Sequence, residues 1–180
     1  MGGSAEGAAL DLGQAELRIL GGDDDVGNAI IIDLAGNVVV SGWSWGSGGN
    51  LDLAVWRYDW NGTLDATFGT LGVVTDSTGA GGGGDEYGAD LVLDVSGGLY
   101  VCGDSRNLLG DLDLVVWSLD ATGAMTPSFG SGGIAAFDAP NAGVAQAGNG
   151  IVLDSLGRII VAGWADNPPN ASDMALWRIE

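Results

Sequence analysis

The fold is decided by residues 27–42, which read GNAIIIDLAGNVVVSG. Two runs of β-branched residues flank an Asp-x-x-Gly tetrad, which is the pattern of two short strands joined by a tight turn. The pattern returns at residues 88–103 and 148–163. The turn residue Asp33 is followed by Asp94 and Asp154, so the spacing is 61 residues and then 60. We therefore interpret the chain as three copies of one β-rich repeat.

Other positions keep the same register. A glycine ends the second strand of each copy, and a tryptophan lies in the third; they are Gly42, Gly103, Gly163, Trp56, Trp117 and Trp177. The strand around each tryptophan is apolar on both faces, which indicates a sheet covered on both sides. Four strands in about 60 residues suit a β-propeller blade. We predict an all-β chain of three four-stranded blades, and a β-trefoil is the alternative.

The chain divides into repeat cores at residues 27–87, 88–147 and 148–180 of one domain. The third core stops at the start of a hairpin turn, and residues 1–26 have about the length of the missing piece. Because a propeller has about four to eight blades, we predict that residues 1–26 complete the third repeat of another copy. Two chains would then form a six-bladed ring. A head-to-tail filament and three blades of a longer array are the alternatives.

Three pieces of the repeat resemble the bacterial delta-60 repeat, a propeller-like repeat of secreted and surface proteins. They are the Asp-x-x-Gly turn with the Val-x-Gly stretch after it, the strand DLAVWR at residues 52–57, and LDATFG at residues 64–69. Ser118 departs from this pattern, since Arg57 and Arg178 occupy its position in the other copies. The resemblance implies a repeat architecture and an extracellular or cell-surface location. It brings no catalytic residues.

The composition excludes several classes of function. The 180 residues contain no His and no Lys, and the net charge is -19. Nucleic acid and anionic membranes are therefore not expected as partners. Most hydrolase triads and zinc sites are also excluded, and no carboxylate departs from the repeat pattern in an otherwise apolar setting. We predict a non-catalytic structural or adhesive module that assembles with itself by exchanging its N-terminal strand.

The tryptophans at the strand ends suggest a different function. Trp43 and Trp164 follow the repeated glycine, Trp45 lies nearby, and Asp104 occupies the position in the second copy. Such rings can stack on a sugar, so the alternative function is a lectin-like module that binds glycans. Packing between blades explains the same residues.

An acidic run and three single residues complete the candidates. Asp23, Asp24 and Asp25 offer the oxygen ligands that calcium prefers, although a surface loop explains them too, and no other cofactor is expected. Arg57 and Arg178 are expected to pair with carboxylates such as those of Asp52 and Asp173. Cys102 occupies a small-residue position within a strand, so we expect a packed thiol.

Overall fold

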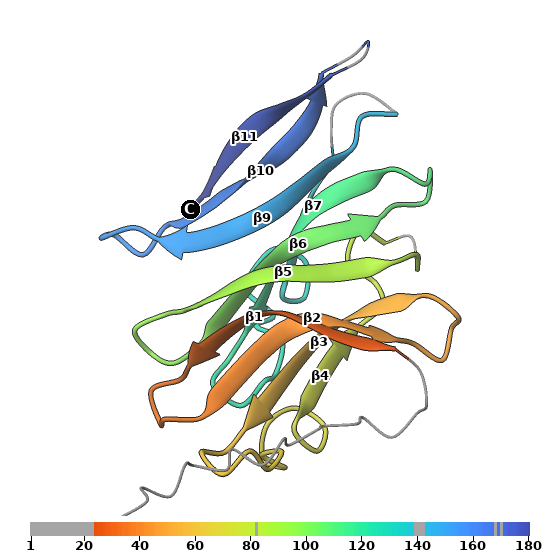
Figure 1. The fold of residues 1–180 in the computed structure, drawn as a ribbon. Coiled ribbons are helices and arrows are strands. Elements are labelled where there is room, and N and C mark those ends of the chain that lie inside the picture. Colours follow the sequence, from red (N-terminus) through yellow and green to blue (C-terminus); the bar gives the residue numbers. More distant parts are fainter. Residues whose placement is uncertain (1–23, 82, 139–142, 168, 170) are drawn as a thin grey trace, which may run out of the picture.

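The structure is a computed structural model that describes residues 24–81, 83–138, 143–167, 169 and 171–180. These residues form eleven β-strands and no helix, in three antiparallel sheets. Figure 1 shows the sheets stacked one upon another, from the orange and yellow strands at one end to the blue strands at the other. None of the described residues forms a helix that could cross a membrane.

Each sheet comes from one sequence repeat, and we call the sheets blades 1, 2 and 3. Blade 1 contains β1 (Asp25–Ile32), β2 (Val38–Trp45), β3 (Leu51–Tyr58) and β4 (Val73–Asp76). Blade 2 contains β5 (Glu86–Leu93), β6 (Leu99–Arg106), β7 (Leu112–Leu119) and β8 (Ile134–Phe137). Blade 3 contains β9 (Gln146–Leu153), β10 (Ile159–Asn167) and β11 (Ala171–Ile179).

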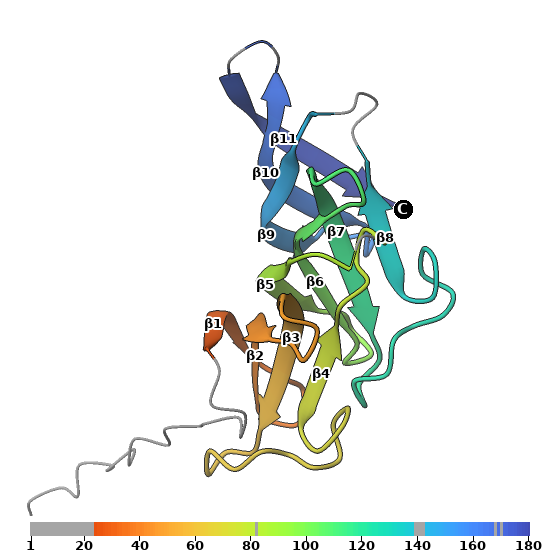
Figure 2. The same ribbon diagram turned by 90° about the vertical axis from the view of Figure 1, so that its right-hand side faces the viewer.

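The stacked sheets confirm the prediction of propeller blades and contradict the β-trefoil alternative. Among the described residues, each sheet contains strands of one repeat alone, so strands of different repeats do not pair into a common barrel. The repeats meet through the faces of their sheets, because those faces are apolar on both sides. The three blades are not closed into a ring (Figure 2).

The blades begin slightly earlier than the glycines that mark the repeat cores. The first strands start at Asp25, Glu86 and Gln146, each two residues ahead of the corresponding glycine. Blade 3 has three described strands, and β11 pairs on one side with β10. The fourth strand predicted from the N-terminal residues falls mainly on residues 1–23, which lie outside the described residues.

The Asp-x-x-Gly tetrads form turns as the sequence predicts. In the first of them, one Asp33 carboxylate oxygen accepts hydrogen bonds from the backbone N–H groups of Ala35 and Asn37, both at 2.8 Å. Gly36 has a φ of 88°, which a residue with a side chain seldom adopts. The same two backbone bonds recur at Asp59, Asp94, Asp120 and Asp154. Five of the 24 acidic residues of the chain therefore stabilise turns.

The repeated glycine of the second strand faces a β-bulge. The pairing between β5 and β6 shifts by one residue between Gly88 and Asp90. A Cβ atom on Gly103 would lie 1.7 Å from the Tyr87 carbonyl oxygen. Gly42 and Gly163 face carbonyl oxygens of Val26 and Ala147 in the same way. Glycine recurs here because the bulge brings one backbone against another.

Candidate functional site

Contacts between blades use the two faces of each sheet. We call the face toward the next blade along the chain the front face, and the opposite one the back face. Between blades 1 and 2, the front-face residues Leu53 and Val55 are buried in one cluster with the back-face residues Leu91 and Val101. Between blades 2 and 3, the front-face residues Leu114 and Val116 of blade 2 are buried in one cluster with the back-face residues Ile151 and Val161 of blade 3. Equivalent positions of the repeat therefore form both interfaces.

The back face of blade 1 is open. It consists of Ile30, Ile32, Val38, Val40 and Tyr58, and we call it the open back face. Ile30 is 66% exposed, whereas the equivalent Leu91 in blade 2 is 3% exposed. The difference arises because blade 1 covers Leu91 and no described residue covers Ile30 in this way.

The front face of blade 3 is open as well. It consists of Val152, Ile160, Ala162, Met174 and Leu176, and we call it the open front face. Met174 is 80% exposed, whereas the equivalent Leu114 is fully buried. Contiguous apolar surface of this kind marks interaction sites on soluble proteins.

One repeated tryptophan lacks the hydrogen bond that its counterpart makes. The Trp117 indole nitrogen donates to an Asp76 carboxylate oxygen at 2.8 Å, and Asp76 ends the fourth strand of the preceding blade. The equivalent Trp56 indole nitrogen is buried and has no acceptor among the described residues. A buried N–H group normally finds a partner. In the described part of the chain, the back face of blade 1 therefore lacks, at Trp56, an acceptor such as the Asp76 carboxylate that blade 1 supplies to Trp117 of blade 2.

A buried carboxyl lies between blades 1 and 2. Glu86 is fully buried, and Ser105 Oγ donates to its Oε1 at 3.1 Å. Its Oε2 has no partner among the described residues. Burial raises the pKa of the Glu86 carboxyl to about 8, partly offset by the bond from Ser105. The position is polar in every copy, with Asp25 in the first and Gln146 in the third, and this was its sequence signal.

Asp104 corrects the expectation that no carboxylate departs from the repeat pattern in an otherwise apolar setting. It occupies the column of Trp43 and Trp164, and burial raises its pKa to about 6 while Arg106 opposes the rise. Neither Asp104 nor Glu86 is among the residues that line the groove described below. Their perturbed pKa values therefore come from blade packing rather than from an open site.

The strand-end tryptophans do not gather at one place. Trp43 packs edge-on against Tyr87 of blade 2, with ring centroids 6.3 Å apart. Trp45 is exposed at the end of β2, and Trp164 is partly buried in β10 of blade 3. Packing between blades therefore accounts for Trp43.

Arg57 does pair with a carboxylate, but the partner differs from the expected Asp52. Its guanidinium lies 2.8 Å from an Asp65 oxygen and 4.6 Å from the centre of the Phe68 ring. Arg178 lies 3.0 Å from Glu180 rather than beside Asp173. Asp52 and Asp173 instead accept bonds from the side chains of Asn50 and Asn167. The partners of both arginines depend on which residues are neighbours in the folded sheet, and the spacing of residues in the sequence does not reveal this.

The acidic run gives no calcium site among the described residues, which contain no group of three or more acidic, His or Cys side chains able to hold a metal. Asp25 lies in β1 opposite Ser44, and the Asp24 carbonyl accepts from the Trp45 N–H. Asp23 lies outside the described residues. Calcium binding by this run stays a prediction.

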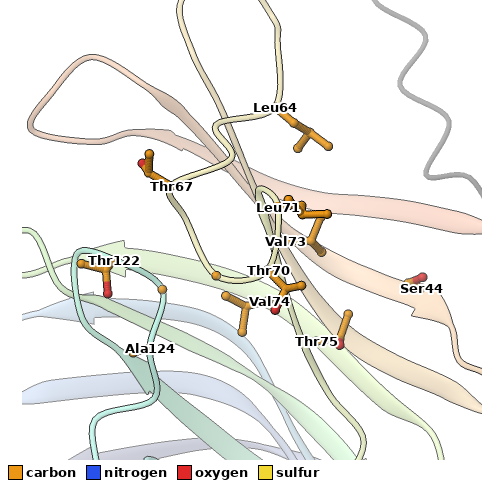
Figure 3. Close-up of a pocket in the computed structure, with 12 residues that line it drawn as sticks. Ser44, Leu64, Thr67, Thr70, Leu71, Val73, Val74, Thr75, Thr122 and Ala124 are labelled. Atoms are coloured by element: carbon orange, nitrogen blue, oxygen red, sulfur yellow. The ribbon is translucent and has the colours of Figure 1, made fainter.

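A groove of about 850 Å³ lies beside blade 1. Figure 3 shows its walls, which come from the segment between Leu64 and Thr75 and from the hairpin at Thr122 of blade 2. The described residues that line it carry hydroxyl and aliphatic groups and no charged side chain. General acid–base catalysis needs a titratable group at the reacting atoms, so this groove offers no catalytic machinery.

One comparison with known proteins agrees with a propeller-like fold. A family model described as "Domain of unknown function (DUF5122) beta-propeller" matches residues 36–68, which is less than half of the chain. No curated protein matches. The solved structures include a fucose lectin from Kordia zhangzhouensis in complex with methyl-fucoside, 18% identical, with a TM-score of 0.47. The match covers 83% of this chain and 90% of the lectin. This likeness is too low to carry an argument about the fold or the ligand of the chain.

Proposed function

We propose that the chain is a non-catalytic β-propeller-type module that works by binding further blades through its two open faces. The observation that supports this proposal is that equivalent positions of the three repeats carry similar apolar residues. The open front face and the open back face carry the residue positions that are buried at both interfaces inside the chain. Burying apolar surface is the main favourable term in such association.

The first test compares two exposed leucines. Leu176 lies on the open front face and is 66% exposed, whereas Leu108 lies in the turn between β6 and β7 and is 83% exposed. The wild type should have a mass by light scattering above the 18.0 kDa of one chain. Leu176→Asp should reduce it to one chain, and Leu108→Asp should leave it unchanged. A wild type that is monomeric at tens of micromolar would overturn the proposal.

We further propose that the residues ahead of β1 add a fourth strand to blade 3 of another copy. Blades 1 and 2 have a fourth strand, and in the described residues β11 leaves one edge free. An open edge pairs readily with another strand. The Trp56 indole without an acceptor also supports a strand at this position. Removal of residues 1–20 should weaken assembly, and assembly of equal strength would contradict the exchange.

Glycan binding is the second candidate, since Trp45 presents an exposed ring at the end of β2. Aromatic rings at such positions can stack on sugars. A glycan that binds there should change the tryptophan fluorescence of the wild type and not that of Trp45→Ala. Fluorescence unmoved by a broad panel of glycans would count against this function. The extracellular location implied by the family resemblance stays a prediction.

A further inference from the structure

Three residues on the front face of blade 1 contact blade 2 through groups other than aliphatic side chains. Asn28 Nδ2 donates to the Gly88 carbonyl at 2.8 Å, and Arg57 Nη1 donates to the Ala121 carbonyl at 2.7 Å. Trp43 packs edge-on against Tyr87. These contacts come from β1, β3 and β2, so they extend across the sheet.

Blade 3 repeats all three residues. The equivalents of Asn28, Trp43 and Arg57 are Asn149, Trp164 and Arg178. Blade 2 differs at every one of these positions, where it has Ala89, Asp104 and Ser118. Asn149 and Arg178 are exposed, and no described blade follows them. The open front face thus carries the groups with which blade 1 holds its neighbour.

The open back face has room for such a neighbour at Gly27. The equivalent Gly88 and Gly148 are buried, and a Cβ on them would lie 2.7 Å from Leu53 and 2.6 Å from Leu114 across the interface. Gly27 is exposed, and a Cβ there would meet only Val40 of its own sheet. Glycine therefore occurs where a side chain of a preceding blade fits, and Met174 has the equivalent position on the open front face.

We infer that the open front face binds the open back face of a second copy of this chain, and that two such seams close a ring. This rests on the proposed function and names its partner. One copy provides three blades, below the four to eight of propellers, and two copies provide six. A twofold axis makes both seams identical. In each seam, Asn149 donates to the Gly27 carbonyl of the second copy, Arg178 donates to its Trp60 carbonyl, and Met174 covers Gly27.

Disulfide formation between copies tests the seam. A Cβ on Gly148 lies 3.4 Å from that of Cys102, and the equivalent pair across the seam is Gly27 and Ala162. This separation is close to the Cβ distance of about 3.5–4.5 Å in disulfides. Gly27→Cys and Ala162→Cys proteins should therefore form a disulfide-linked dimer when mixed and oxidised. Neither protein alone should do so. Because the new side chain at position 27 displaces the end of Met174, light scattering must show that the mixture still assembles, and an assembled mixture that stays unlinked would overturn the seam.

A double variant tests the polar contacts of the seam, and the mass of the assembly tests whether the ring closes. Asn149→Ala with Arg178→Ser installs the residues of blade 2 at exposed positions, and it should raise the dissociation constant at least tenfold. The wild-type mass should be twice 18.0 kDa, or 36.0 kDa. Larger multimers would overturn the closed ring. Assembly without the disulfide and indifferent to the double variant would overturn this seam but leave the proposed function standing, whereas a monomer would overturn both.

Discussion

Leu71 has an unfavourable backbone conformation. Its φ is 55°, and it is the non-glycine residue with a positive φ among the described residues. The equivalent residue in blade 2 is Gly132, with a φ of 66°. A left-handed conformation costs a residue with a Cβ roughly 1–2 kcal/mol. Because Leu71 is 73% exposed, its side chain regains little of this by burial.

Leu71→Gly should therefore stabilise the protein by about 0.5–1 kcal/mol, after allowance for the larger entropy of glycine in the unfolded chain. Urea denaturation measures the change. Leu71→Ala is the control, since it shortens the side chain and keeps the strain, and Gly132→Leu should lose stability. A loss on Leu71→Gly would show that the exposed side chain contributes more than the strain costs.

Glu86 makes stability depend on pH. Burial raises its pKa from 4.5 to about 8, so the folded state holds a proton that the unfolded state has released. Folding stability from this group is therefore complete below about pH 4.5 and is lost as the pH rises toward about 8. Glu86→Gln removes the titration, and Gln146 already occupies this position in blade 3.

We expect the stability of Glu86→Gln minus that of the wild type to grow from pH 4.5 to pH 8 and then to level off. The gain at the upper end should be on the order of a few kcal/mol. Urea titrations of both proteins at several pH values give this difference. The contributions of the other carboxyl groups to the pH dependence are the same in both proteins and cancel. A difference that is independent of pH would contradict the buried, proton-binding carboxyl.

At the scale of the strand, the bulge glycines are the most demanding positions. A methyl group on Gly103 would strike the Tyr87 carbonyl oxygen, which belongs to the backbone of the paired strand. Gly103→Ala should therefore cost about 3 kcal/mol or more, measured by chemical denaturation. Gly150→Ala is the matched control in blade 3, because its new methyl group would meet only an Asp90 oxygen at 3.7 Å. Equal losses in both variants would mean that strand flexibility, and not the bulge, sets the cost.

The strands and turns could be predicted from the sequence because their rules are local. Alternation, β-branching and the Asp-x-x-Gly spacing each act within a few residues. The burial of Glu86 could not, because blade 1 covers it through residues far away in the chain. Arg57 shows the same limit, since its carbonyl partner at Ala121 is 64 residues away. The exposure of Ile30 and Met174 also escaped prediction, because all three repeats share one apolar pattern and only their position in the chain distinguishes them.

For the whole molecule, charge opposes assembly. Each chain has a net charge of -19, so two copies repel one another. Salt screens this repulsion over a distance of about 10 Å at 0.1 M. We expect the dissociation constant to fall as the salt concentration rises from about 0.02 M to 0.5 M. Sedimentation at constant pH measures it, and weaker assembly in high salt would mean that ion pairs dominate the contact.

The buried thiol gives the molecule a native reporter of motion. Cys102 is fully buried between blades 2 and 3, as expected of a packed thiol, and burial raises its pKa to about 12. A disulfide reagent can therefore react only while blade 3 is lifted from its neighbour. The rate at which the wild-type protein reacts with such a reagent can be compared with the rate of global unfolding. A faster reaction measures how often blade 3 separates from blade 2 without unfolding of the whole chain.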